Sequence, residues 1–136
     1  MIRGFVNEND EPLLPIALIL KNRPRRFEAV LDTGFNGHLS VPQSIVRQSG
    51  WYFAGYEEYE IATGDRVRER VYLGRMILDR QRLTTHVVTS RAKDILIGTK
   101  LLSDKMLCVD FKERTLWVRK SRGNKMMKRH RRPKIG

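Results

Sequence analysis

The chain has 136 residues, of which 40% are hydrophobic and 31% charged, and its formal net charge is +12. This length and composition are typical of one globular domain and exclude a disordered chain. Nine Lys or Arg and no acid lie from residue 119 onward, which leaves residues 1–118 with 18 basic and 15 acidic residues, a net charge of +3. We therefore predict a globular domain over residues 1–118 and a basic, disordered tail over residues 119–136.

The first fifty residues predict short strands separated by turns. Apolar and β-branched runs alternate with clusters of turn-forming residues, and Gly50 would end a short helix that begins after Pro42. The predicted strands are 2–7, 13–21, 27–32 and 38–42, the turns are 8–12 and 22–26, and the helix is 43–49.

The rest of the chain, up to the tail, continues the same pattern. Residues 59–73 predict a hairpin with Thr63, Gly64 and Asp65 at its tip. Thr99 is a plausible N-cap for a second short helix over 100–105. The remaining predicted strands are 75–79, 83–90 and 94–98, and a last hairpin pairs 106–111 with 115–120.

Nine or ten short strands and one or two short helices predict an all-β fold, a small closed or folded-over barrel. The chain also contains a weak internal repeat, which we call the internal echo. The strand over 27–32 and the strand over 94–98 both run into a glycine, and a short predicted helix follows each of them. This echo indicates two related halves around a pseudo-twofold axis.

Asp32 is the candidate functional residue with the clearest context. It ends an apolar strand and is followed at once by Thr33 and Gly34. Such a tripeptide can be a simple turn, because Asp and Gly form turns readily and an Asp side chain can cap its own backbone. Alternatively, Asp32 is a catalytic acid. The motifs elsewhere in the sequence help to decide between a simple turn and a catalytic residue.

Three segments, in this order along the chain, resemble motifs of the retropepsin-like aspartic proteases. VLDTGFNGHLSVP (30–42) resembles their catalytic Asp-Thr-Gly loop, ATGD (62–65) falls where they have the tip of the flap, and ILIGTKLL (95–102) falls at their second-half strand and helix. The resemblance covers roughly residues 2–118 and is closest to the short single-domain prokaryotic members. It implies a closed barrel of the acid-protease type and an aspartic endopeptidase.

The resemblance also implies roles for individual residues. Asp32 would be catalytic, the Thr33 hydroxyl would brace the loop across the twofold axis, and Gly34 would let a substrate or partner backbone approach. Phe35 and Asn36 would contact the substrate from the loop. The flap would bind the extended substrate through Ala62, Thr63, Gly64 and Asp65, and the structural second-half motif would be Ile95, Leu96, Ile97 and Gly98. Gly64 could instead serve only the hairpin turn.

An aspartic protease needs two carboxylates that share one proton, and this chain contains one Asp-Thr-Gly and no Asp-Ser-Gly. A symmetric homodimer would supply the second Asp32, so we predict a homodimer acting on a peptide or protein substrate. The alternative is a catalytically weak dimeric β-barrel interaction module that binds nucleic acid through its basic tail.

Two departures from the family's pattern affect the loop. Familiar viral members pair an acid two residues after the motif's Gly with an arginine after the second-half Gly, and Asn36 and Thr99 stand at those positions here. Phe35 stands where small residues are common in viral members. We hypothesise that it narrows a pocket next to the dyad and favours small substrate side chains.

Metal and cofactor sites have little support in the sequence. Cys108 is the single cysteine, which excludes an internal disulfide, and its apolar neighbours predict a buried core position. His38, His86 and His130 have neither i, i+4 spacing nor a cysteine partner. We predict no metal and no cofactor.

The location and further partners are predicted from weaker signals. The apolar run 13–20 is too short to cross a membrane and follows an acidic segment, so we expect no transmembrane segment and a cytoplasmic, reducing location. The tail could bind nucleic acid or an anionic surface, or act only as a solubilising extension. The aromatic residues Trp51, Tyr52, Phe53 and Tyr56 could pack at the core or rim, or form a stacking platform for bases.

Overall fold

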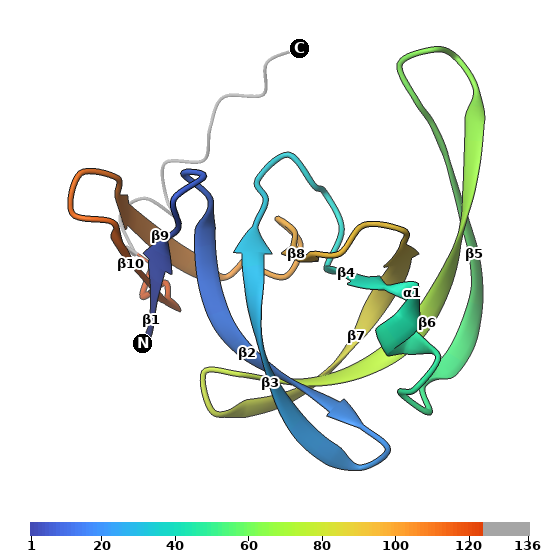
Figure 1. Cartoon of the computed structure of the whole chain (residues 1–136), viewed down its shortest axis with the longest axis horizontal. Coiled ribbons are helices and arrows are strands. Elements are labelled where there is room, and N and C mark those ends of the chain that lie inside the picture. Colours follow the sequence, from blue (N-terminus) through green and yellow to red (C-terminus); the bar gives the residue numbers. More distant parts are fainter. Residues whose placement is uncertain (124–136) are drawn as a thin grey trace.

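A computed structural model describes residues 1–123, and within them one ten-stranded sheet curls around an apolar core (Figure 1). The strands are β1 (Ile2–Val6), β2 (Pro12–Leu20), β3 (Arg23–Leu31), β4 (Leu39–Pro42), β5 (Tyr52–Glu60), β6 (Arg66–Leu78), β7 (Gln81–Ser90), β8 (Ile95–Ile97), β9 (Lys105–Asp110) and β10 (Thr115–Lys120). The one α-helix in this part of the chain is α1 (Gln43–Val46).

Six strands form a closed barrel. Their order is β6-β7-β4-β8-β3-β2, and β2 closes the ring by pairing with β6 through Ala17 opposite Ile77 and Leu18 opposite Met76. Outside the ring, β5 pairs with β6, and β1, β10 and β9 continue the sheet from β2. The predicted all-β fold with a closed barrel and one or two short helices is therefore confirmed.

The core follows from the two-residue period of the strands. In β2, the alternate residues Leu14, Ile16 and Leu18 are at most 3% exposed and point into the barrel. Buried side chains from the other barrel strands, such as Met76 and Val87, pack against them. This core supports the ends of β3 and β8, where the candidate catalytic loop begins.

Two predicted breaks were wrong because the chain stays extended through them. The turn predicted over 22–26 is only Lys21 and Asn22, both with positive φ (50° and 66°), and β3 begins at Arg23. The hairpin arm predicted to end at residue 73 and the strand predicted over 75–79 are one strand, β6. Gly74 is buried within it, and a Cβ there would overlap the side chain of Val87.

Two further predictions were wrong near the C-terminal hairpin. The helix predicted over 100–105 is a series of turns that leads into β9. Cys108 is exposed rather than buried, because the period-two alternation of β9 turns Leu107 and Val109 toward the core and Cys108 away from it.

The predicted domain boundary at residue 118 remains a prediction. β10 runs through Lys120, and residues 124–136 of the predicted basic tail lie outside the described residues. Among residues 1–123, no helix is long and apolar enough to cross a membrane.

Candidate active site

Asp32 lies at the end of two adjacent parallel strands near the middle of the sheet. β3 pairs with β8 in the register Val30 to Leu96 and Leu31 to Ile97, and the Asp32 N–H continues this ladder by donating to the Ile97 carbonyl at 2.9 Å. The Asp32 side chain is half-buried. The barrel therefore holds the Asp32 backbone in place while its carboxylate remains accessible.

The loop that follows Asp32 is organised around its carboxylate. The Gly34 N–H donates to Asp32 Oδ1 at 2.9 Å, and the Phe35 N–H donates to the Asp32 carbonyl at 3.1 Å. The first bond is the side-chain turn that Asp-x-Gly permits, and it fixes one carboxylate oxygen. Within residues 1–123 no hydrogen bond reaches Oδ2 of Asp32, so this oxygen is available to bond to a water molecule or a substrate. Thr33 and Asn36 are exposed.

The segment that follows β8 holds the loop from the other side through backbone hydrogen bonds. The Gly98 N–H donates to the His38 carbonyl at 3.0 Å, and the Lys100 N–H donates to the Gly37 carbonyl at 3.1 Å. Gly98 is buried against this loop, and a Cβ at residue 98 would lie 2.7 Å from the Phe35 carbonyl oxygen and overlap that of Gly37. Two segments about 64 residues apart are therefore in direct backbone contact. A glycine is required where they cross.

Replacing Gly98 with alanine is expected to lower the free energy of unfolding by about 1–3 kcal/mol, because the new methyl group overlaps backbone that cannot move aside. Urea denaturation of the purified variant would measure this loss. The matched change is Gly34→Ala, whose Cβ would approach only the Asp32 side chain, at 3.2 Å. It should cost about 0.5 kcal/mol. Equal losses for the two variants would contradict the packing role of Gly98.

Thr99 and Phe35 hold the loop together through hydrogen bonds. The Thr99 N–H donates to the Phe35 carbonyl at 2.9 Å, and the Thr99 hydroxyl donates to the same oxygen at 3.5 Å. The Phe35 ring lies against the open faces of Gly37 and Gly98, where a Cβ would come within 2.7 Å of it. Phe35 thus fills the crossing between the loop and the segment after β8. Its hypothesised effect on substrate choice stays a prediction.

The predicted flap is the hairpin of β5 and β6, which projects beyond the barrel at the same end as the loop after β3 (Figure 1). Its turn closes through hydrogen bonds from the Ile61 N–H to the Asp65 carbonyl and from the Gly64 N–H to the Ile61 carbonyl, both at 2.9 Å. Gly64 has φ of +87°. The predicted flap residues 62–65 are all exposed. In the described chain no hydrogen bond joins this tip to the Asp32 loop.

The base of the hairpin, unlike its tip, lies next to the loop after Asp32. A hollow of about 290 Å³ is lined by Gly37 and His38 from the loop and by Ala54, Glu57 and Val71 from the hairpin. Closer to the tip, the Tyr59 hydroxyl donates to Glu69 at 2.6 Å. This hydrogen bond, with smaller contributions from burial and from the charges of Glu69 and Glu57, raises the pKa of Tyr59 to about 12.

The sequence gives no sign that His38 and His86 are neighbours, but in the structure their imidazole rings are in contact. β4 and β7 run parallel with Leu39 opposite Val87, which places the preceding histidines edge to face at 5.8 Å between ring centroids. Burial lowers the pKa of His38, and electrostatic interactions with His86 and Lys100 lower it further, whereas Glu57 opposes them. Only the strand register could have predicted this pair. No group of three metal-ligating side chains occurs in the described residues.

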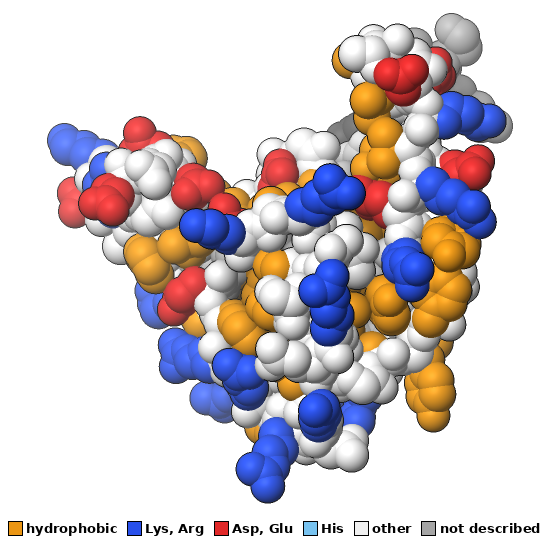
Figure 2. Space-filling model, turned by 45° about the vertical axis from the view of Figure 1, so that its right-hand side comes forward, with side chains coloured by type: hydrophobic (Ala, Val, Ile, Leu, Met, Phe, Trp, Pro, Cys, Tyr) orange, Lys and Arg blue, Asp and Glu red, His pale blue; other side chains and the backbone are white. Residues whose placement is uncertain are grey.

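The aromatic residues after α1 have two separate roles. Trp51 is half-buried and donates its indole N–H to the Ile19 carbonyl at 2.9 Å, which is a packing role. Phe53 and Tyr56 lie on the exposed hairpin, and the Arg68 guanidinium stacks 3.8 Å from the Tyr56 ring centroid. Figure 2 shows hydrophobic and basic side chains interleaved along this hairpin. Base stacking on it stays a prediction.

Comparisons with known proteins support the fold. No family model and no curated protein matches the sequence. The simian foamy virus (mac) protease in solution is similar, with 16% identity over 65% of this chain and 91% of that chain and a TM-score of 0.50. EIAV protease in complex with the inhibitor HBY-793 is similar, with 14% identity over 72% and 90% and a TM-score of 0.53. The chain therefore has the retropepsin-like acid-protease fold.

Proposed function

We propose that the chain is an aspartic endopeptidase that acts as a homodimer, with one Asp32 from each subunit forming the catalytic pair. The observation that carries this proposal is the position of Asp32. It ends a central strand, accepts a hydrogen bond from Gly34 and is locked by the segment after β8, in a barrel with the fold of retroviral proteases. This arrangement supports a catalytic role because it holds the Asp32 backbone in place and leaves the carboxylate accessible.

Peptide-bond hydrolysis of this type uses two carboxylates about 3 Å apart that share one proton, as in the aspartic proteases. The ionised carboxylate takes a proton from water while the water oxygen bonds to the scissile carbonyl carbon. The protonated carboxylate donates its proton to the carbonyl oxygen. Collapse of the tetrahedral species breaks the C–N bond, and the amine leaves with a proton.

Other loop residues take supporting roles in this proposal. Thr33, exposed in the single chain, would brace the loop against the partner's loop across the twofold axis. Gly34 leaves room for the partner or substrate backbone. Phe35 and Asn36 would contact the substrate beside the pair, and the β8 residues Ile95 and Ile97, both buried, hold the loop from the core.

The hairpin of β5 and β6 would close over a bound peptide. An extended peptide could add as a strand between the flap tip and the catalytic loop, bonded through backbone groups. Closure would exclude water from the reacting bond. Residues 62–65 are exposed in a tight turn, which supports their availability for such contacts.

Replacing Gly64 with valine is expected to lower kcat/KM about tenfold or more, because φ of +87° strains any side-chain-bearing residue and would reshape the flap tip. Steady-state cleavage assays would measure this loss. Gly50→Val is the matched control: Gly50 has φ of +75° and open space around it, but lies after α1, away from the flap. If both variants lose activity equally, Gly64 serves only the turn.

The proposed activity is tested by incubating the chain with a diverse peptide pool between about pH 4 and pH 7, with and without a transition-state analogue of aspartic proteases. Cleavage that the analogue blocks supports the proposal. Folded, dimeric protein that neither cleaves peptides nor binds the analogue would favour the alternative, an interaction module. The basic tail would then be tested for nucleic-acid binding by its salt dependence.

A further inference from the structure

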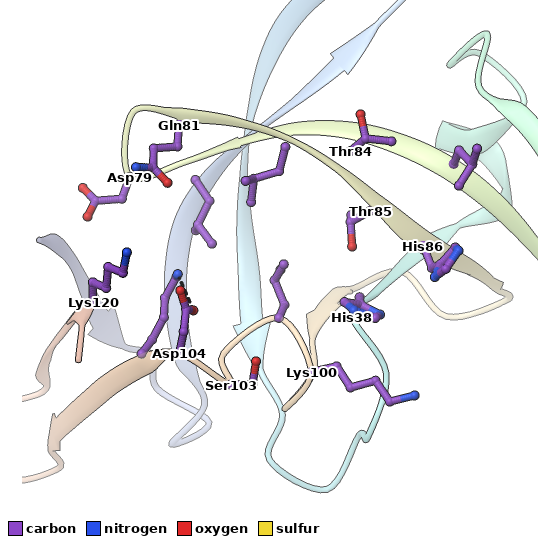
Figure 3. A pocket seen from close by; sticks show the side chains of 15 residues that line it. His38, Asp79, Gln81, Thr84, Thr85, His86, Lys100, Ser103, Asp104 and Lys120 are labelled. Carbon is purple, nitrogen blue, oxygen red and sulfur yellow. Dashed lines mark hydrogen bonds and ion pairs between the residues drawn. The ribbon is translucent and has the colours of Figure 1, made fainter. Parts of the chain in front are cut away.

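A second hollow lies on the side of the barrel, between the hairpin of β6 and β7 and the turns over 99–104. Its volume is about 510 Å³, which is in the range of small-molecule sites. Figure 3 shows side chains from β7, from the 99–104 turns and from the ends of β9 and β10 pointing into it. It lies outside the Asp32 loop, apart from His38 on its edge.

The hollow contains a buried hydroxyl without a partner. Thr85 is 6% exposed, and its Oγ1 makes no hydrogen bond to any described residue. Figure 3 shows that this hydroxyl points into the hollow, on the side where His86 and His38 lie. A buried hydroxyl is unfavourable unless something bonds to it, so this atom offers a hydrogen bond to a polar group that enters the hollow.

The wall beside Thr85 is apolar. Leu78 is 2% exposed, and Leu83 and Leu101 are half-buried, and all three line the hollow. These side chains come from β6, β7 and the 99–104 turns, so they form a surface on more than one side. A hydrocarbon chain would bury apolar surface here without leaving polar groups unbonded.

The opposite end of the hollow contains two lysines and two acids. Lys105 and Lys120 line it, and Lys105 is only 17% exposed. The two acids at this end already have partners: Asp104 pairs with Lys105 at 2.8 Å, and Asp79 pairs with the Met1 ammonium at 3.0 Å. Lys120 has no ion pair within residues 1–123. Lys100 also lines the hollow, but its ammonium points away from Thr85 (Figure 3).

We propose that this hollow binds a small amphipathic anion. A carboxylate or phosphate group would lie beside Lys120, whose ammonium has no ion pair in the described residues. An apolar body would pack against the three leucines, and a hydroxyl or amide would bond to Thr85. The site is separate from the proposed catalytic pair and needs no second subunit. Its test is a binding measurement that does not depend on peptide cleavage.

The test is a titration of the full chain, followed by ¹H–¹⁵N NMR, with 10-hydroxydecanoate as the probe. We expect saturable shifts at the amides of Thr85, His86 and Leu101, and weaker binding of decanol, which lacks the anionic group. Lys120→Gln should weaken binding about fivefold. Lys112→Gln, in the turn between β9 and β10, removes the same charge outside the hollow and should leave affinity unchanged.

The Thr85 contact is tested by comparing 10-hydroxydecanoate with decanoate. Wild-type chain should prefer the hydroxylated probe, and Thr85→Val should abolish this preference while keeping the shape of the side chain. Shifts that do not saturate, or that map to the exposed β5–β6 hairpin, would overturn the proposal. So would equal effects of Lys120→Gln and Lys112→Gln, or a hollow that holds only water and binds no probe.

Discussion

Replacing Asp32 with asparagine is expected to reduce kcat/KM for peptide cleavage by at least about 10³-fold. Asparagine can neither accept a proton from water nor share one with a partner carboxylate, so the first chemical step loses its base. The fold should survive, because the asparagine oxygen can still accept the hydrogen bond that Gly34 donates to Asp32 Oδ1. Cleavage of a peptide pool by wild type and variant, at matched protein concentration, measures the difference.

The control for this substitution is Asp110→Asn. Asp110 accepts a hydrogen bond from the Glu113 N–H at 3.0 Å in the turn between β9 and β10, and asparagine can keep that bond. The charge change is therefore identical, but it lies outside the proposed site, and activity should match the wild type. If Asp32→Asn retains full activity, the cleavage comes from another site or another protein. The barrel would then have to be explained as an interaction module.

Most strands were predictable because their sequences alternate or carry continuous apolar runs bounded by turn formers. The loop at Asp32 was predictable for the same reason: an apolar strand that stops at Asp-Thr-Gly has few local alternatives. The hairpin of β5 and β6 was predictable from Gly64 between two runs of strand-forming residues, and its turn closes where expected. These features depend on local chemistry, which a sequence displays directly.

The features that were missed depend on contacts between distant segments. Gly74 looks like a break in the sequence, yet it lies inside β6 because Val87 packs where its side chain would be. Cys108 has apolar neighbours, but the face it occupies is set by the pairing of β9 with β10. The meeting of His38 and His86 depends on the register of β4 against β7. None of these registers can be read from a window of sequence.

The structure places the two segments of the internal echo side by side. The strand before Asp32 and the strand before Gly98 pair directly, and each is followed by a segment that bonds to the other's loop. The internal echo in the sequence is therefore consistent with a structural crossing. In the register of β3 against β8, Gly98 and Thr99 follow Ile97 as Asp32 and Thr33 follow Leu31, so the second segment has no acid at this point. The chain contains one Asp-Thr-Gly and no Asp-Ser-Gly, so a pair of catalytic aspartates would need a second chain.

For this reason, activity is expected to require two chains, and an excess of Asp32→Asn subunits should inactivate wild type beyond simple dilution. After unfolding and refolding together, an equal amount of variant should leave about one half of the wild-type activity, and a ninefold excess about one tenth, because mixed dimers hold one carboxylate. Cleavage assays at constant wild-type concentration measure this. The same excess of an unrelated protein is the control and should have no effect.

The dilution behaviour of the wild type provides an independent check. If the pair forms only in the dimer, specific activity should fall when the protein is diluted below the dimer dissociation constant, and sedimentation should show monomers over the same range. If neither dilution nor excess Asp32→Asn subunits change the specific activity, a single chain is sufficient for cleavage. A second acid within the chain would then have to act with Asp32. Asp65 at the flap tip would be the first to replace, since the flap is the element proposed to close over the Asp32 loop.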